Sequence, residues 1–392
     1  MINFRDHKAP LLAGLVASAT GTAASLGVAL SALTAVGASK DQTATAVVLM
    51  ILAYGILSIV LSWRFKMPIS IVWSTPGAAL LVSAGVLHLS FAASVGAFLI
   101  TGFLLALTGL WPQLGRLVSS IPKPIANAML AGVIFSFCIS PFQAVVTYPA
   151  IILPVLVVWL VLFRFATIWA APAAIALSYS LIAWQMPVDT SKLALFPHIA
   201  AVAPSFEWQA VISVALPLYL VTMASQNIPG VAIMHSFGFE VPFKPALATT
   251  GITTMLLAPF GGYALNLAAI TAALNANEHA HPNPKRRWLA SVWGGVAYLV
   301  LAVVAAPTVA FVLETPRVLI LAASGLALLG TMGGALKEIT AADNLRMPAV
   351  VAFLVGASGI APWGVGAAFW ALLAGVTVWR VQLLATERAK TA

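Results

Sequence analysis

The stretch MPISIVWSTPGAALLVSAG, Met67 to Gly85, decides the fold. It begins with a β-branched segment, Ile69 to Thr75, that favours extended backbone. Pro76 then suits the first turn of a helix, and Ser74 or Thr75 can cap that turn. The sequence therefore predicts a short extended segment followed by a half-helix, both inside one apolar run.

A second stretch, APFGGYALNLAAITAALNA (258–276), follows the same plan. Gly261 and Gly262 interrupt any helix, and Asn266 is the predicted cap of a helix from Leu267 onward. If the two stretches run in opposite directions, their helix N-termini meet in mid-membrane, with free N–H groups and positive dipole ends. Broken helices in matching positions of two halves are the best sequence indication of a transporter's binding site.

The composition excludes an ordinary soluble domain. The chain has 392 residues, of which 61% are hydrophobic and 7% charged, whereas soluble domains are about one quarter charged. The net charge of +9 does not indicate a nucleic-acid partner, because the basic residues are dispersed through short loops. The single cysteine, Cys138, excludes a disulfide framework and a cysteine-rich metal site. We predict a lipid-embedded protein without metal or cofactor.

The apolar runs predict about fourteen membrane-spanning segments, each of which needs about 20 residues for a full crossing. The N-terminal run, 9–37, is too long for a signal peptide, whose apolar region spans about 7–15 residues, so we predict it to be the first span. The predicted spans are 10–36, 43–63, 68–88, 91–111, 122–140, 148–163, 166–184, 208–235, 245–258, 259–276, 288–306, 316–335, 347–360 and 363–383.

The basic residues in the loops predict the orientation. With both termini in the cytoplasm, sixteen Lys and Arg residues fall inside, and only Lys40, Lys192 and Arg317 fall outside. The sixteen are Arg5, Lys8, Arg64, Lys66, Arg116, Lys123, Arg164, Lys244, Lys285, Arg286, Arg287, Lys337, Arg346, Arg380, Arg388 and Lys390.

Seven plus seven spans predict an inverted repeat. IPKPIANAMLAGVIFSF (121–137) resembles TPRVLILAASGLALLGT (315–331), and the two broken stretches also occupy equal positions in their halves. The predicted fold class is therefore an all-α polytopic membrane protein of about fourteen helices in a 7+7 inverted repeat. Short extended segments and half-helices make up spans 3 and 10.

A polar cluster marks the middle of the eighth span. The stretch VTMASQNIPGVAIM, Val221 to Met234, carries Ser225, Gln226 and Asn227 in a run without charge. Hydrogen bonds between helices are the alternative explanation, above all for a single Ser or Thr. Adjacent amides beside Pro-Gly and near two half-helix ends favour ligand contact. The candidate substrate-binding residues are Ser18, Thr20, Ser74, Thr75, Ser225, Gln226, Asn227, Gly261, Gly262, Tyr263 and Asn266.

Three segments together resemble the benzoate/proton symporter family, the BenE type: MASQNIPGVAIMHSFGF (223–239), ISIVWSTPGAALL (69–81) and the run from 249 to 288. The family is similar in architecture to uracil and sulfate transporters. The resemblance implies a core domain (9–111 and 207–307), a gate domain (112–206 and 308–383), and a homodimer through the gate domain. It also implies import of benzoate, or a similar aromatic carboxylate, with a proton across a bacterial inner membrane.

Benzoate is a flat apolar ring with one carboxylate, which suits two helix N-termini without a buried arginine. The amides of Gln226 and Asn266 are predicted to add charge-assisted bonds. Phe260, Tyr263 and Trp73 are predicted ring neighbours, with packing against lipid or core as the alternative.

The proton path has no carboxylate inside a span, which departs from the related nucleobase carriers. His235 and Glu278, near the inner ends of their spans, are the candidate proton carriers. The alternatives are a purely capping histidine, Glu338 near the inner mouth, or a proton that travels on the substrate carboxylate.

Three other functions compete with this interpretation. The first is a carrier of another small organic anion or a nucleobase on the same fold, and the second is a passive anion channel. The third, a membrane-embedded enzyme, is disfavoured because no catalytic triad or metal constellation is present.

Overall fold

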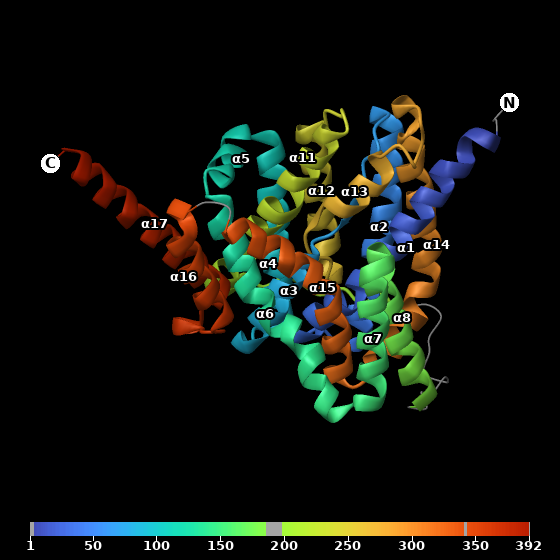
Figure 1. Cartoon of the computed structure of the whole chain (residues 1–392), viewed down its shortest axis with the longest axis horizontal. Helices are drawn as coiled ribbons and strands as arrows, with labels where there is room; N and C mark the ends of the chain where they lie inside the picture. The colour runs from blue at the N-terminus through green and yellow to red at the C-terminus, as the bar shows by residue number, and fades with distance from the viewer. Residues whose placement is uncertain (1–3, 186–197, 341–342, 392) are drawn as a thin grey trace.

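The computed structural model describes residues 4–185, 198–340 and 343–391. Helices make up almost all of it, as Figure 1 shows. Among these residues, eight helical segments are long and apolar enough to cross a membrane. Two shorter apolar helices, Thr75–Leu87 and Pro149–Phe165, add to them. The protein is therefore a polytopic helical membrane protein, as the composition predicted.

Each of the fourteen predicted spans falls on a helix or on a strand followed by a half-helix. The short helix α5 (Pro112–Ser119) was not predicted. The long elements are α1 (Phe4–Ala35), α2 (Lys40–Phe65), α4 (Phe91–Leu110), α6 (Lys123–Thr147), α7 (Pro149–Phe165), α8 (Thr167–Gln185), α12 (Phe243–Leu257), α14 (Trp288–Leu313), α15 (Arg317–Ile339), α16 (Arg346–Ala357) and α17 (Ala367–Thr391).

The two broken stretches fold as predicted, each as a strand followed by a half-helix. Strand β1 (Ile71–Trp73) leads to α3 (Thr75–Ala84), and β2 (Leu265–Leu267) leads to α13 (Ala269–Ala276). The strands pair antiparallel, with Val72 opposite Asn266. This pairing satisfies backbone groups that no helix can satisfy at this depth, and it brings the starts of α3 and α13 together.

The eighth predicted span is a continuous but irregular helical segment, Trp208–Ser236. Two π-helical turns, η3 (Val211–Ala215) and η4 (Met223–Asn227), interrupt the α-helical pieces α9 (Trp208–Ala210), α10 (Leu216–Thr222) and α11 (Ile228–Ser236). A π turn inserts one extra residue and is often found at functional sites.

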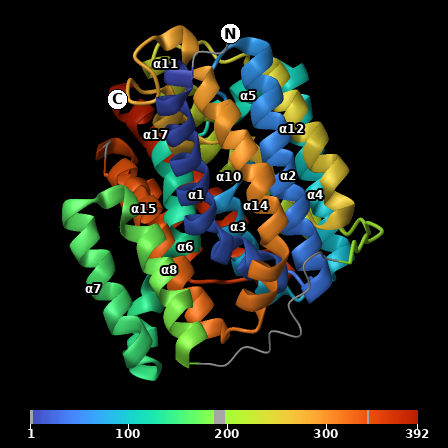
Figure 2. The same ribbon diagram turned by 90° about the vertical axis from the view of Figure 1, so that its right-hand side faces the viewer.

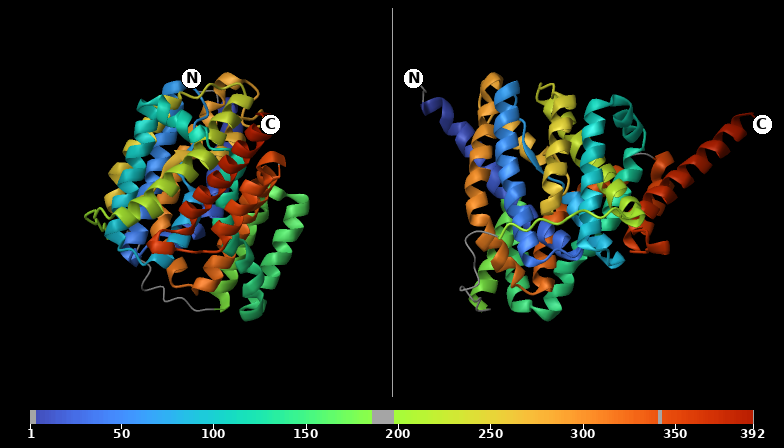
Figure 3. Two further views of the ribbon diagram at one scale, coloured as in Figure 1. Left: turned by 90° about the vertical axis from the view of Figure 1, so that its left-hand side faces the viewer. Right: turned by 180° about the vertical axis from the view of Figure 1, so that it is seen from behind.

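The long helices pack in two groups that are interleaved in sequence. In one, α2 and α1 pack against α14, and α4 packs against α12. In the other, α6 packs against α15 and α16, α16 against α17, and α7 against α8 (Figure 2). In Figure 3, α17 and the start of α1 project at opposite sides of the molecule. α1 also contacts α8 and α15, so it joins the two groups.

Candidate functional site

A cavity of about 330 Å³ lies between the starts of the half-helices and the helices α7, α8 and α15. Its volume is in the range of small-ligand pockets, roughly 300–1,000 Å³. None of its lining residues, in the part of the chain that the structure describes, is charged. The lining comprises Ala17, Thr20, Gly21, Thr22, Ala24, Ser25, Tyr54, Val72, Thr75, Trp159, Phe163, Thr167, Ala170, Ala171, Pro172, Gln226, Ala268, Ala269, Thr271, Leu274, Tyr298, Leu326, Ala327, Gly330 and Thr331.

The two half-helix starts at this cavity are not equivalent. The Ser74 side chain caps α3 by accepting the N–H of Gly77 at 3.0 Å, and Pro76 has no N–H to offer. α13 begins after Ala268, whose side chain can accept no hydrogen bond. The first-turn N–H groups of α13 therefore lack a side-chain cap, and they lie beside an apolar cavity without a counter-charge. This helix start is the stronger attractor for an anion.

The two adjacent amides of the eighth span, both in the π turn η4, have different surroundings. Gln226 lines the cavity. Asn227 is fully buried, and its Oδ1 accepts the N–H of Leu267 in β2 at 3.0 Å. Its Nδ2 contacts the sulfur of Met223 at 3.5 Å. Gln226 is thus available to a ligand, whereas Asn227 anchors the strand that leads to α13.

We expect different losses when these two amides are replaced. The Gln226→Ala variant should lose at least about tenfold in substrate affinity and keep wild-type thermal stability, because it removes a donor to a charged group. The Asn227→Ala variant should lower stability by about 1–3 kcal/mol, because a buried N–H of β2 loses its acceptor. Binding and melting measurements on both purified variants check this pair. Equal melting temperatures for Asn227→Ala and wild type would contradict the anchoring role.

Aromatic side chains line the cavity from both helix groups. Tyr54 and Tyr298 pack edge to face, with ring centroids 5.3 Å apart. Trp159 and Phe163 of α7 stack with centroids 5.2 Å apart. Trp73 lies behind this wall: its indole N–H donates to the Ser25 hydroxyl at 3.0 Å, and its backbone N–H donates to Tyr54. The aromatic lining suits a flat apolar ring.

Other predicted residues lie outside the cavity lining. Ser18 and Ser225 donate to carbonyls of their own helices. Gly261, at φ 83°, makes the turn before β2, and Gly262 packs on Leu257. Tyr263 is buried against Phe98. Of the predicted set, the structure brings Thr20, Thr75 and Gln226 together at the cavity.

The predicted capping role of Asn266 is wrong. Asn266 lies within β2, three residues before the helix starts at Ala269, and its Nδ2 donates to the carbonyl of Leu267 at 3.0 Å. Strand pairing with Val72 holds this residue extended, so the helix begins later than the cap rule indicated. Phe260 and Trp73, predicted as ring neighbours, are also absent from the lining.

Sequence reasoning missed both tyrosines and the whole contribution of α7, α8 and α15. Tyr54 and Tyr298 stand alone in apolar runs, and a hydroxyl at mid-span needs a partner in the absence of water. That signal was available. Nothing in the sequence indicated that Trp159 and Phe163 face a cavity, because apolar residues also face lipid.

The predicted proton carriers lie away from the cavity lining. His235 is exposed in the last turn of α11, and Glu278 is exposed just after α13. The neighbouring loop is held by Arg287, which donates to the carbonyls of Ala276 and His281.

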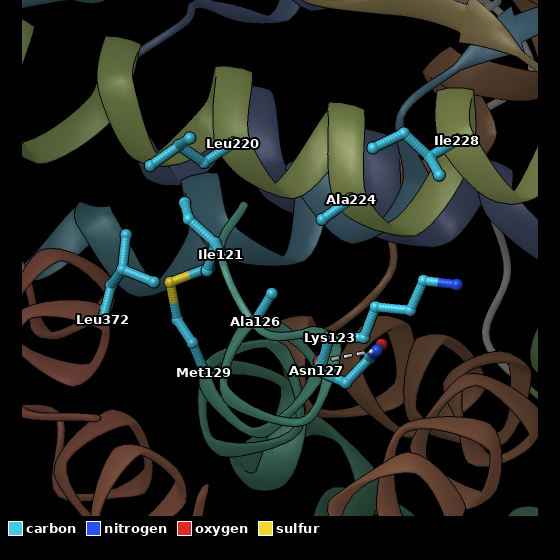
Figure 4. Close-up of a pocket in the computed structure, with 9 residues that line it drawn as sticks. All are labelled: Ile121, Lys123, Ala126, Asn127, Met129, Leu220, Ala224, Ile228 and Leu372. Atoms are coloured by element: carbon cyan, nitrogen blue, oxygen red, sulfur yellow. Dashed lines mark hydrogen bonds between the residues drawn. The ribbon is translucent and has the colours of Figure 1, made fainter. Parts of the chain in front are cut away.

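A smaller pocket lies on the opposite face of the segment that carries Gln226. Leu220, Ala224 and Ile228 line it from that segment, and Figure 4 shows them facing the start of α6 and Leu372 of α17. Its volume is only about 50 Å³. Lys123 and Asn127 stand at its edge, joined by an amide-to-carbonyl bond of 3.0 Å. This small pocket therefore lies between the segment that carries Gln226 and the helices α6 and α17.

Comparison with known proteins gives a family and a fold. Residues 5–381 match the family described as benzoate membrane transport protein. The chain is 36% identical to the inner membrane protein YdcO of Escherichia coli over 96% of this chain and 97% of that protein. It is 32% identical to the benzoate membrane transport protein of Acinetobacter baylyi, over 84% of this chain and 83% of that protein.

Solved structures with a similar fold include a bicarbonate transporter and an anion transporter. The transmembrane domain of the cyanobacterial bicarbonate transporter BicA superimposes with a TM-score of 0.60 at 16% identity, over 96% of this chain and 98% of that domain. The murine Solute Carrier 26 family member A9, in its inward-facing state, gives 0.63 at 12% identity, over 97% of this chain and 68% of that protein. At these identities the likeness concerns the fold alone.

Proposed function

The chain belongs to the benzoate membrane transport protein family, and from this premise we propose that it imports benzoate, or a similar aromatic carboxylate, together with a proton. The observation that carries the proposal is an uncharged, aromatic-lined cavity that meets the uncapped start of α13. In our proposal the carboxylate binds at the first-turn N–H groups of α13 and at the amide of Gln226. The ring packs among Tyr54, Trp159 and Phe163.

Alternating access between a core and a gate domain is the proposed mechanism. The proposed core holds residues 9–111 and 207–307, and the proposed gate holds 112–206 and 308–383. The cavity supports this division, because α1, α13 and α14 line one wall while α7, α8 and α15 line the other. Relative movement of the two walls would expose the cavity to each side of the membrane in turn.

Uptake of labelled benzoate into proteoliposomes tests the function. The experiment compares vesicles with and without an inward proton gradient, with the voltage clamped by potassium and valinomycin. Accumulation that depends on the gradient is the expected result. Flux without accumulation would indicate a passive anion channel instead. Absence of uptake by folded protein would contradict the proposed substrate and direct a screen of other small organic anions and nucleobases.

The location of His235 makes a specific prediction about the proton. Because its side chain is exposed and outside the cavity lining, the His235→Ala variant should bind benzoate with wild-type affinity and should still accumulate it. The Glu278→Gln variant should behave alike. Accumulation and equilibrium binding, measured on the same preparation, check this expectation. If a variant binds benzoate but no longer accumulates it, the replaced residue is a proton relay. If both variants accumulate benzoate like the wild type, the result favours transfer of the proton on the substrate carboxylate.

We further propose a location in a bacterial inner membrane, in line with the name of the Escherichia coli relative. Cytoplasmic termini and a homodimer through the gate domain stay predictions.

A further inference from the structure

The hydroxyl of Tyr298 is a buried polar group that the binding scheme above leaves unused. Tyr298 of α14 is 2% exposed, and its ring packs against Tyr54. Its hydroxyl lies near that of Thr271. Among the described residues, however, the Tyr298 hydroxyl has no hydrogen-bond partner. A buried hydroxyl without a partner is costly. Such a group beside a ligand cavity indicates that the ligand supplies the missing acceptor.

The position of this hydroxyl coincides with the start of α13. Thr271 is the third residue of that helix, and Tyr298 and Thr271 both line the cavity. On the facing helix α1, a methyl group added at Gly21 would lie 3.7 Å from the Tyr298 hydroxyl and 3.6 Å from Thr271 Oγ1. The glycine therefore leaves room for a methyl-sized group in contact with both hydroxyls.

We propose that Tyr298 donates a hydrogen bond to the substrate carboxylate, which lies in the space that Gly21 leaves open at the first turn of α13. The inference rests on the proposed function and adds a named residue to it. An O–H donor to a carboxylate forms a short, charge-assisted bond. The helix start supplies the field and N–H groups, and Tyr298 supplies directional recognition of the anionic end.

Two other tyrosines are poorer candidates for this role. The Tyr54 hydroxyl accepts the backbone N–H of Trp73, which holds it at the end of the strand pair where Trp73 faces Leu265, away from the start of α13. Tyr263 is fully buried, and its hydroxyl also has no hydrogen-bond partner among the described residues, yet Tyr263 does not line the cavity. Tyr263 therefore provides a matched control: the same residue type, equally buried, without access to the ligand.

The test is equilibrium binding of benzoate and of benzamide to purified wild-type, Tyr298→Phe and Tyr263→Phe protein. We expect Tyr298→Phe to weaken benzoate binding by at least about tenfold and benzamide binding by less, so that discrimination between the two falls. Tyr263→Phe should leave both affinities unchanged. Gly21→Ala, whose added methyl would make only ordinary contacts, should also weaken benzoate binding by filling the space of the carboxylate.

Each other outcome counts against the inference. Wild-type benzoate affinity in Tyr298→Phe would overturn it, and so would equal losses for benzoate and benzamide, which indicate a structural role alone. If Tyr298→Phe does not fold, wild-type affinity in Gly21→Ala would overturn it instead. If folded wild-type protein does not bind benzoate, the proposed function itself is contradicted. If wild-type protein binds benzoate and Tyr298→Phe binds it equally well, only the role of Tyr298 is contradicted.

Discussion

The Gly330→Leu variant is expected to lose benzoate uptake by at least about tenfold while remaining folded in the membrane. Gly330 lines the cavity from α15, and an added Cβ there would meet no atom within 4 Å. A leucine side chain would therefore extend into the space of the substrate ring without displacing protein atoms. The fold should tolerate the change, since leucine favours a helix over glycine by roughly 1 kcal/mol.

Substitutions of increasing side-chain volume at Gly330 distinguish the effect of filling the cavity from the effect of losing a glycine. Uptake should fall progressively through Gly330→Ala, Gly330→Leu and Gly330→Trp. Gly333 provides the matched control, because it lies one turn farther along α15, has equally open surroundings and does not line the cavity. The Gly333→Leu variant should transport at the wild-type rate. Initial rates in proteoliposomes check both series, and full activity in Gly330→Trp would show that this cavity does not hold the substrate.

The second large effect is expected at Gly27, where α1 meets α8 and α15. An added Cβ would lie 2.9 Å from Ser324 Oγ and 3.3 Å from the Tyr179 hydroxyl. On α1 the cavity lining ends at Ser25, and on α15 it begins at Leu326, so this contact lies just beyond one end of the lining. We call Gly27, Tyr179 and Ser324 the α1–α15 seal. In the predicted orientation it lies on the outer side.

The α1–α15 seal has the features of a reversible contact. Gly27 permits close approach of α1 to its neighbours. The Tyr179 hydroxyl is buried without a hydrogen-bond partner among the described residues, a penalty that water would relieve on opening. Hydration of this hydroxyl would offset part of the cost of separating the helices, which fits the alternating access proposed above.

The Gly27→Val variant should bind benzoate yet transport it at least about tenfold more slowly. Overpacking costs about 1–3 kcal/mol, and about 1.4 kcal/mol corresponds to a factor of ten, so closure of the α1–α15 seal becomes unfavourable. Adding Ser324→Gly should restore part of the rate, because it removes the nearest obstructing atom. Uptake and binding of the single and double variants check this. A wild-type rate in Gly27→Val would contradict the role of the seal.

Local sequence chemistry was sufficient for the half-helices. β-Branched residues before Pro76 and the glycine pair after Pro259 each predicted their breaks, because these residues next to a proline disfavour a continuous helix. The same local reasoning failed at Asn266, where pairing with β1 outweighed the preference of asparagine for a helix cap.

The candidate site was only partly predictable. Gln226 stood out because an amide in an apolar run requires a partner. Which of Gln226 and Asn227 faces the cavity depends on the contact of Asn227 with β2, and no residue in that stretch signals this distant contact. Gly330 lines the cavity from a helix whose sequence resembles any lipid-facing span.

The sequence by itself determined the membrane environment, the positions of the apolar helices and the two breaks, since composition and backbone preference act over a few neighbouring residues. The tertiary structure alone decided which faces of those helices enclose the cavity, that α13 rather than α3 presents an uncapped start, and that Gly27 packs closely on α15 beyond the lining. The physical reason is the solvent. In lipid an apolar side chain is equally stable against lipid or protein, so only the packing of distant helices selects the face that meets a ligand.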